Sequence, residues 1–63
     1  MPRIETIVQQ AARLDVLCAE AAQASRSQAA KWIESGVCSV NGTVQLKPSF
    51  KAGEGAEIVI DVP

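Results

Sequence analysis

The clearest chemical signal in the 63-residue sequence is a serine and a glutamine three residues apart. The Ser25 hydroxyl can accept a hydrogen bond from the backbone N–H of Gln28, and the Gln28 side chain can reach back, which is the capping box of a helix start. The free N–H groups and positive dipole end of such a helix can bind a phosphate group. Arg26 and Ser27 lie in that first turn and Lys31 lies about one turn further along. On this local pattern alone, a capped helix with a solvated polar face explains the same residues better than phosphate binding does.

Enzyme chemistry lacks candidate residues in this chain. The sequence contains no His and no Tyr, so neither Cys18 nor Cys38 has an imidazole to activate it, and the serines have no base partner. Two cysteines without a His do not make a zinc site, and Gly53–Gly55 is better explained as a turn than as a phosphate loop. We therefore expect a non-enzymatic chain with no metal and no cofactor, whose cysteines are reduced thiols packed as small hydrophobes.

Composition and charge limit the chain to one small domain. Hydrophobic residues make up 48% and charged residues 21%, which is typical of a globular fold. No apolar run approaches the roughly 20 residues that cross a bilayer, and no apolar signal stretch follows Met1, so we expect a cytoplasmic protein that does not bind membranes. The net charge of −1 counts against nucleic-acid binding if it is taken as a whole. Its distribution is uneven, however, because acids crowd the end of the chain while most cations lie in the middle: Arg13, Arg26, Lys31, Lys47 and Lys51.

Two helices must position these residues. Leu14, Leu17, Cys18 and Ala21 recur at helical spacing between residues 13 and 22, with Asp15 and Glu20 off that stripe. The second helix runs from Arg26 to Ser35, with Ala29, Trp32 and Ile33 on one face and Gly36 placed for a left-handed C-cap. The short loop between them predicts a helical hairpin.

The sequence predicts strands on both sides of the helical hairpin. Residues 4–8 favour a strand, although a helix is nearly as good an interpretation. The run 37–46 predicts a β-hairpin with a type I′ turn at Asn41-Gly42. A two-residue loop there puts Val37, Val44 and Leu46 on the opposite face from Cys38 and Val40. A bulge or a longer loop would instead bring these apolar side chains to the same face.

The end of the chain completes the predicted fold. Pro48 ends the preceding strand, residues 53–55 form a turn and residues 57–62 form the last strand. The sequence therefore predicts an α+β domain in the order (β)ααβββ, in which a two-helix hairpin packs on a small antiparallel sheet. The exposed edge of so small a sheet leaves dimerisation open. Because Pro63 follows a strand directly, we expect residues 1–63 to be a single domain of a longer chain.

Several short segments in order resemble one known family. They are Arg13-Leu14-Asp15, Ser25-Arg26-Ser27-Gln28-Ala29, Lys31-Trp32-Ile33, Gly36, Val40-Asn41-Gly42, Lys47-Pro48-Ser49, Gly53-Glu54 and Ile58-Val59-Ile60. Together they resemble the S-four RNA-binding domain. The Lys-Pro-Ser stretch and the Ile-x-Ile-x-Val-Pro ending are most similar to the amino-terminal domain of the large-subunit-type ribosomal RNA pseudouridine synthases, which are isomerases.

The resemblance implies that the two helices and the adjoining hairpin face RNA. The residues that it places at backbone phosphates are Arg13, Ser25, Arg26, Ser27, Gln28 and Lys31, with Asn41, Lys47 and Ser49 at the rim. It places Asp15 inside the protein, where the side chain would hold neighbouring residues in position. Because this chain is poor in charge, we expect weak binding with a shallow salt dependence, a slope of roughly −3 to −4 in log K against log salt for about four cationic contacts.

The resemblance also implies a role. The leading hypothesis is a module that positions structured ribosomal RNA for an attached pseudouridine synthase domain, so that the parent protein is an isomerase and takes part in ribosomal RNA processing. A free-standing RNA-binding protein associated with the ribosome or with transfer RNA is the first alternative. The second is a protein-interaction module that has lost RNA binding, which the acidic composition favours.

Overall fold

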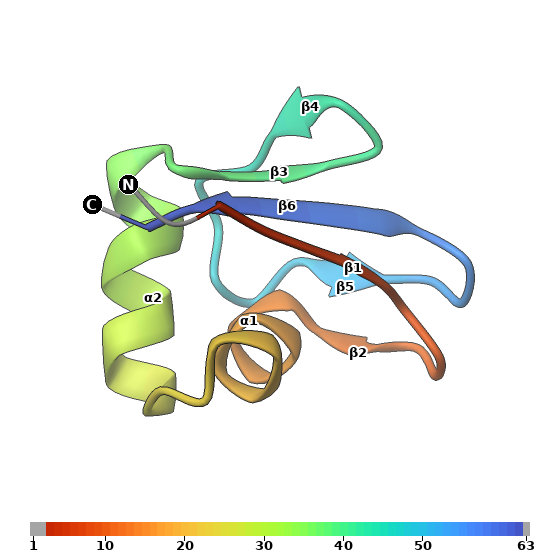
Figure 1. Ribbon diagram of the computed structural model, residues 1–63, viewed down its shortest axis with the longest axis horizontal. Coiled ribbons are helices and arrows are strands. Elements are labelled where there is room, and N and C mark those ends of the chain that lie inside the picture. Colours follow the sequence, from red (N-terminus) through yellow and green to blue (C-terminus); the bar gives the residue numbers. More distant parts are fainter. Residues whose placement is uncertain (1–2, 63) are drawn as a thin grey trace.

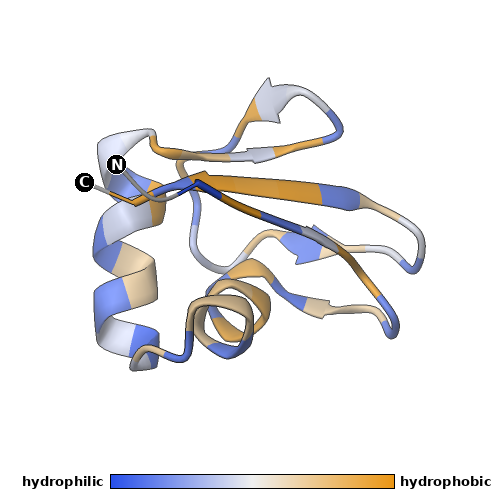
Figure 2. Cartoon of the chain, in the orientation of Figure 1, coloured by the Kyte–Doolittle hydropathy of each residue, from blue (hydrophilic) through white to orange (hydrophobic). Residues whose placement is uncertain are grey.

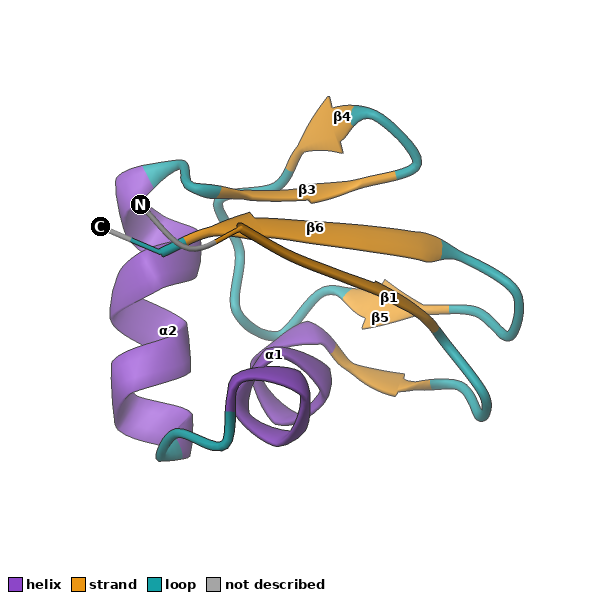
Figure 3. Cartoon of the chain, in the orientation of Figure 1, coloured by secondary structure: helices purple, strands orange, loops and turns teal. Residues whose placement is uncertain are grey.

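Two helices pack on one side of a small antiparallel sheet in the computed structural model, which describes residues 3–62 (Figure 1, Figure 3). Its elements are β1 (Arg3–Ile7), β2 (Ala12–Arg13), α1 (Leu14–Ala22), α2 (Arg26–Ser35), β3 (Cys38–Val40), β4 (Thr43–Val44), β5 (Lys51–Ala52) and β6 (Glu57–Asp61). The predicted α+β class with a helical hairpin on an antiparallel sheet is confirmed. Within residues 3–62, neither helix has the length and apolar character that would let it cross a membrane.

β6 is a central strand of a four-stranded sheet with the order β1-β6-β3-β4. Ile58 pairs with Thr6 of β1 on one side and with Val40 of β3 on the other. Ile58 and Ile60 are 0% exposed because their side chains point at the helices. Alternation along the strand therefore turns Glu57, Val59 and Asp61 to the opposite side, which we call the outer face of the sheet.

Two short strands were missed by the sequence prediction. β2 and β5 pair as a separate antiparallel ribbon in which Ala12 lies opposite Ala52 and Arg13 lies opposite Lys51. Each has only two residues, too few to show a period-2 pattern in sequence. The strand interpretation of the N-terminal segment is confirmed with a shift of one residue: Val8 lies beyond β1, and its backbone N–H donates to the Ala56 carbonyl at 2.9 Å.

The helices begin and end close to where local signals put them. α2 starts after Ser25 and ends at Gly36, whose φ of 87° is the left-handed conformation expected of that glycine. α1 starts at Leu14, because Arg13 is extended and serves as its N-cap residue. Its buried residues are Leu14, Asp15, Cys18 and Ala19, so the prediction that Asp15 lies off the buried stripe was wrong.

The β3–β4 hairpin has the predicted two-residue turn. Asn41 and Gly42 both have positive φ, 52° and 83°, and Val40 pairs with Thr43 across them. No bulge is needed, because Val44 and Leu46 remain outside the core, with exposed fractions of 55% and 60%. β4 ends at Val44, so the predicted strand through Leu46 was too long.

The core lies between the helices and the inner face of the sheet. Figure 2 shows the apolar colour concentrated along β6, while α2 alternates hydrophilic and apolar residues. Trp32 and Phe50 are partly buried and pack at the edge of this core. The buried hydrophobic cluster consists of Val8, Leu14, Cys18, Ala19, Ala29, Ile33, Cys38, Val40, Ala52, Ala56, Ile58 and Ile60.

Candidate functional site

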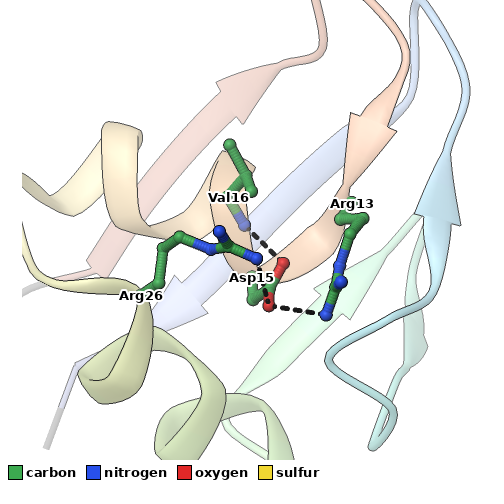
Figure 4. A network of polar contacts seen from close by, with 4 residues as sticks. All are labelled: Arg13, Asp15, Val16 and Arg26. Atoms are coloured by element: carbon green, nitrogen blue, oxygen red, sulfur yellow. Dashed lines mark hydrogen bonds and ion pairs between the residues drawn. The ribbon is translucent and has the colours of Figure 1, made fainter.

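A buried carboxylate joins the starts of the two helices (Figure 4). Asp15 is 5% exposed, and its Oδ1 accepts a hydrogen bond from the Val16 backbone N–H at 2.8 Å. Its Oδ2 accepts from Nη2 of Arg13 at 3.1 Å and lies 3.6 Å from Nη2 of Arg26. Arg13 precedes α1 and Arg26 opens α2, so this single acid contacts two arginines that the family resemblance places at backbone phosphates.

The arginines themselves remain accessible to solvent. The side chains of Arg13 and Arg26 are 49% and 60% exposed, whereas that of Asp15 is 7% exposed. A guanidinium group has five N–H donors, and the contacts with Asp15 use Nη2 of each arginine. The other nitrogens can donate to an oxyanion at the surface.

Backbone hydrogen bonds fix the start of α1 against a distant loop. The N–H groups of Leu14 and Asp15 donate to the carbonyl oxygens of Phe50, at 2.7 Å, and Pro48, at 3.1 Å. With Val16 bonded to the Asp15 carboxylate, the first N–H groups of α1 are already paired within the protein. Any phosphate here must therefore be bound by side chains and not by the end of this helix.

The same backbone bonds bring the loop between β4 and β5 to the site. Lys47 and Ser49, both exposed, flank Pro48, whose carbonyl oxygen accepts from α1. Lys51 lies opposite Arg13 in the β2–β5 pair. This proximity could not be predicted from the sequence, because it depends on pairing between two-residue strands.

The start of α2 forms the other side of the site. Ser25 Oγ accepts a hydrogen bond from the Gln28 N–H at 3.1 Å, as predicted. Among the hydrogen bonds of residues 3–62, the Gln28 side chain does not complete the capping box. Arg26 and Ser27, together with Asp15 and Ala30, line a shallow open hollow. Lys31 is exposed one turn after Ser27 on the same side of the helix.

Asn41 lies apart from the other predicted contact residues. Figure 1 shows the β3–β4 turn at the opposite end of the sheet from α2. The Asn41 side chain is used within the fold, since its Oδ1 accepts from the Glu57 N–H at 3.0 Å, and its own N–H donates to the Glu57 carbonyl at 2.8 Å. The structure thus assigns Asn41 a role in tying the hairpin to β6.

Three acids lie together on one face of the fold, while Glu20 and Glu34 lie on the helices. Glu5, Glu57 and Asp61 lie on the outer face of the sheet, where Arg3 is within 3.7 Å of Glu5 and 3.9 Å of Asp61. The cations on the β2–β5 ribbon, on α2 and in the loop before β5 belong to elements outside the strands that carry these three acids. We call Arg13, Arg26, Lys31, Lys47 and Lys51 the cationic surface. In a domain with a formal net charge of −1, these cations thus lie apart from the three acids of the outer face.

Sequence reasoning did not include Lys51 among the contact residues of this site. The resemblance placed Asp15 inside the protein, where the structure has it. The i, i+2 spacing of Arg13 and Asp15 was visible in the sequence, but that spacing alone does not show the burial of the acid. Burial depends on Arg26 and on the loop carbonyls, which are distant along the chain.

Comparison with known proteins agrees with this geometry. The sequence profile of the S4 domain matches residues 12–58, about three quarters of the chain. The matched segment begins at β2 and includes both helices and the whole cationic surface, whereas β1 lies outside it. No curated protein is similar enough in sequence to count as a match. The chain therefore belongs to the S4 domain family, whose members are generally non-catalytic RNA-binding modules.

Proposed function

We propose that this domain binds structured RNA through the cationic surface. The observation that carries the proposal is the pairing of the buried Asp15 carboxylate with both Arg13 and Arg26. A carboxylate in this position holds the two guanidinium groups at the surface before any ligand arrives. Binding then loses less side-chain entropy than it would with free arginines, because each immobilised long side chain costs about 0.5–1.5 kcal/mol.

The chemistry of the surface suits a phosphate backbone better than a base edge. Guanidinium groups donate two parallel hydrogen bonds to phosphate oxygens, and the lysines add point charges beside them. Aromatic stacking platforms are scarce, since Trp32 and Phe50 both pack against the core. Recognition by the shape and backbone of a folded RNA helix follows from this composition.

The finer proposal is that the RNA is ribosomal and that the domain orients it for an attached pseudouridine synthase domain. Its support is the resemblance of Lys47-Pro48-Ser49 and of the Ile-x-Ile-x-Val-Pro ending to the amino-terminal domain of those enzymes. We further propose a cytoplasmic location, because the free thiols of Cys18 and Cys38 suit a reducing compartment.

Titration with labelled RNA at several salt concentrations tests the proposal. The probes are a ribosomal RNA stem-loop, a transfer RNA and an unstructured strand of equal length. The Arg26→Ala plus Lys31→Ala variant removes two cations from the surface, and Arg3→Ala is the matched control because Arg3 is 61% exposed on the outer face. At about 0.1 M salt we expect the double variant to bind roughly tenfold to sixtyfold more weakly, with a salt slope shallower by about 2.

Three results would contradict the proposal. They are no detectable binding of any RNA at low salt, equal losses in the double variant and in Arg3→Ala, and a preference for the unstructured strand. A preference for transfer RNA over the ribosomal stem-loop would contradict only the finer proposal. Isolation of the domain within its full-length protein would show whether a synthase domain accompanies it.

A further inference from the structure

Two thiols meet in the middle of the core. Cys18 on α1 and Cys38 on β3 are both free and 0% exposed, and their Sγ atoms are 3.2 Å apart. We propose that this pair is an oxidation site, which a hydroperoxide converts to a reversible intramolecular disulfide between α1 and β3. RNA binding makes no use of either thiol, so the site is separate from the cationic surface.

The geometry favours one product. A disulfide bond is about 2.05 Å long, so the two sulfur atoms must approach by about 1 Å from their present contact. The sequence has no third cysteine that could compete for either partner. Burial of both thiols also shields them from the cysteines of other molecules, which disfavours intermolecular disulfides.

The oxidation balances with a hydroperoxide as the oxidant. One of the two cysteines, as its thiolate, attacks one peroxide oxygen, the O–O bond breaks, and the departing oxygen takes up a proton; that cysteine becomes a sulfenic acid. The other cysteine then attacks the sulfenic sulfur, the S–S bond forms and the S–O bond breaks, and the hydroxide leaves as water with the proton of the second thiol. Overall, two thiols are oxidised and one hydroperoxide is reduced to water and an alcohol, or to two waters if the oxidant is hydrogen peroxide.

The electrostatics of the pair distinguish the two sulfurs. The hydrogen bond with Cys18 lowers the pKa of the Cys38 thiol although burial opposes this. The hydrogen bond with Cys38 and burial together raise the pKa of Cys18. These shifts belong to the packed pair, whose contact is lost when the domain opens, so either thiol can attack the oxidant and the other is then the resolving thiol.

Burial sets the rate of the reaction. An oxidant reaches the thiols only when the helices separate from the sheet, and a domain of this size is open in on the order of one molecule in a thousand. Oxidation should therefore be slow and limited by opening. Denaturant below the unfolding midpoint should accelerate it by increasing the open population.

The consequence for the fold follows from the position of the bond. Cys18 and Cys38 are 20 residues apart, and the covalent loop between them contains the whole of α2 (Arg26–Ser35). Closing a loop of about 20 residues lowers the unfolding equilibrium constant by roughly two-hundredfold in the chain-entropy treatment. Because α2 carries Arg26 and Lys31, the oxidised domain keeps its cationic surface assembled under stress that unfolds the reduced form; this last step rests on the proposed function.

Peptide mapping after peroxide treatment tests the site. The wild-type chain is incubated with hydrogen peroxide, alkylated in denaturant and digested with trypsin. We expect the peptides 14–26 and 32–51 to be joined, since the Lys47–Pro48 bond resists cleavage, and to separate after dithiothreitol. Thermal unfolding of the oxidised form should lie roughly 15–25 °C above that of the reduced form. The Cys18→Ala plus Cys38→Ala variant is the control and should show no shift with peroxide.

Each other outcome overturns the proposal. Sulfinic acid on separate peptides, disulfide-linked dimers, or unchanged thiols at a denaturant concentration that opens the domain would show that the pair does not close. A joined peptide without a rise in unfolding temperature would show that the bond does not hold α2. RNA binding can fail in all of these protein forms without affecting the mapped disulfide, so the two proposals are tested independently.

Discussion

Replacing Asp15 with Asn changes a single charge at the centre of the candidate site. The side chain keeps its size, and its oxygen can still accept from the Val16 N–H, which is now 2.8 Å from Oδ1. The new amide NH2 group faces Nη2 of Arg13 and Nη2 of Arg26, so two donors meet where a carboxylate oxygen had accepted. We therefore expect Asp15→Asn to release both arginines.

The loss of stability can be worked from the exposure of each contact. Arg13 and Arg26 are 49% and 60% exposed, so solvent screens both pairs and each contributes at most about 1 kcal/mol. Losing the negative charge at the first turn of α1 costs about another 0.5 kcal/mol. The sum is at most about 2.5 kcal/mol, a large part of the roughly 3–5 kcal/mol expected for a domain of this size. Urea unfolding followed by the fluorescence of Trp32, the single tryptophan, measures this difference.

The effect of Asp15→Asn on RNA binding combines two contributions that have opposite signs. Removing a negative charge near a phosphate strengthens attraction by about 0.7 kcal/mol at 6 Å in water, and salt screens this gain. Releasing two arginines weakens binding by about 1 kcal/mol or more at any salt concentration. We expect Asp15→Asn to bind RNA about fivefold more weakly at high salt, with a smaller difference at low salt. Circular dichroism under the assay conditions must show the variant folded.

Tighter binding by the folded Asp15→Asn variant at all salt concentrations would refute the reasoning. Such a result would mean that Asp15 merely repels phosphate and that the arginines need no fixed orientation. An Asp15→Asn variant as stable as the wild type would refute the energetic part, because it would show that neither ion pair contributes to the fold.

Substitutions at three further positions separate structural from RNA-contacting residues. Ser25→Ala removes the N-cap of α2 and should cost about 1 kcal/mol in urea unfolding, whereas Ser25→Gly should cost only a few tenths. Gly36→Ala should cost about 1–2 kcal/mol through its φ of 87° alone, because the added Cβ would meet Leu46 at an ordinary 3.6 Å; a cost near zero would contradict this. Asn41→Ala should destabilise the domain by about 1–2 kcal/mol and leave RNA affinity unchanged, so a specific loss of affinity in the titration would restore Asn41 to the contact surface.

Local signals were enough to predict α2 and the β3–β4 hairpin. Ser25 caps the helix and Gly36 ends it because side-chain capping and left-handed φ are properties of a few neighbouring residues. Asn41-Gly42 fixes the turn for the same reason. Arg26 and Lys31 could be proposed as a pair from the sequence, since the helical repeat determines their positions relative to each other.

The assembled site could not be predicted in this way. The position of Arg13 beside Lys51 and the burial of Asp15 depend on contacts that cross more than thirty residues of chain, namely the bonds from the start of α1 to Pro48 and Phe50. Such contacts form only once the whole core is packed. A spacing rule applied to Arg13 and Asp15 detects an ion pair, but it cannot distinguish a solvated pair from one whose acid is enclosed.

The overall charge was misleading for a related reason. A net charge of −1 describes the attraction of RNA only if all charges act from similar distances. Here Glu5, Glu57 and Asp61 lie on the outer face of the sheet, across the hydrophobic core from the helices, in a domain that measures 26 × 20 × 19 Å. The Debye length at physiological salt is about 8 Å, so a phosphate at the cationic surface is largely screened from those acids. The same acids act over about 30 Å at 0.01 M salt, so their repulsion should offset part of the gain in affinity that dilution otherwise produces.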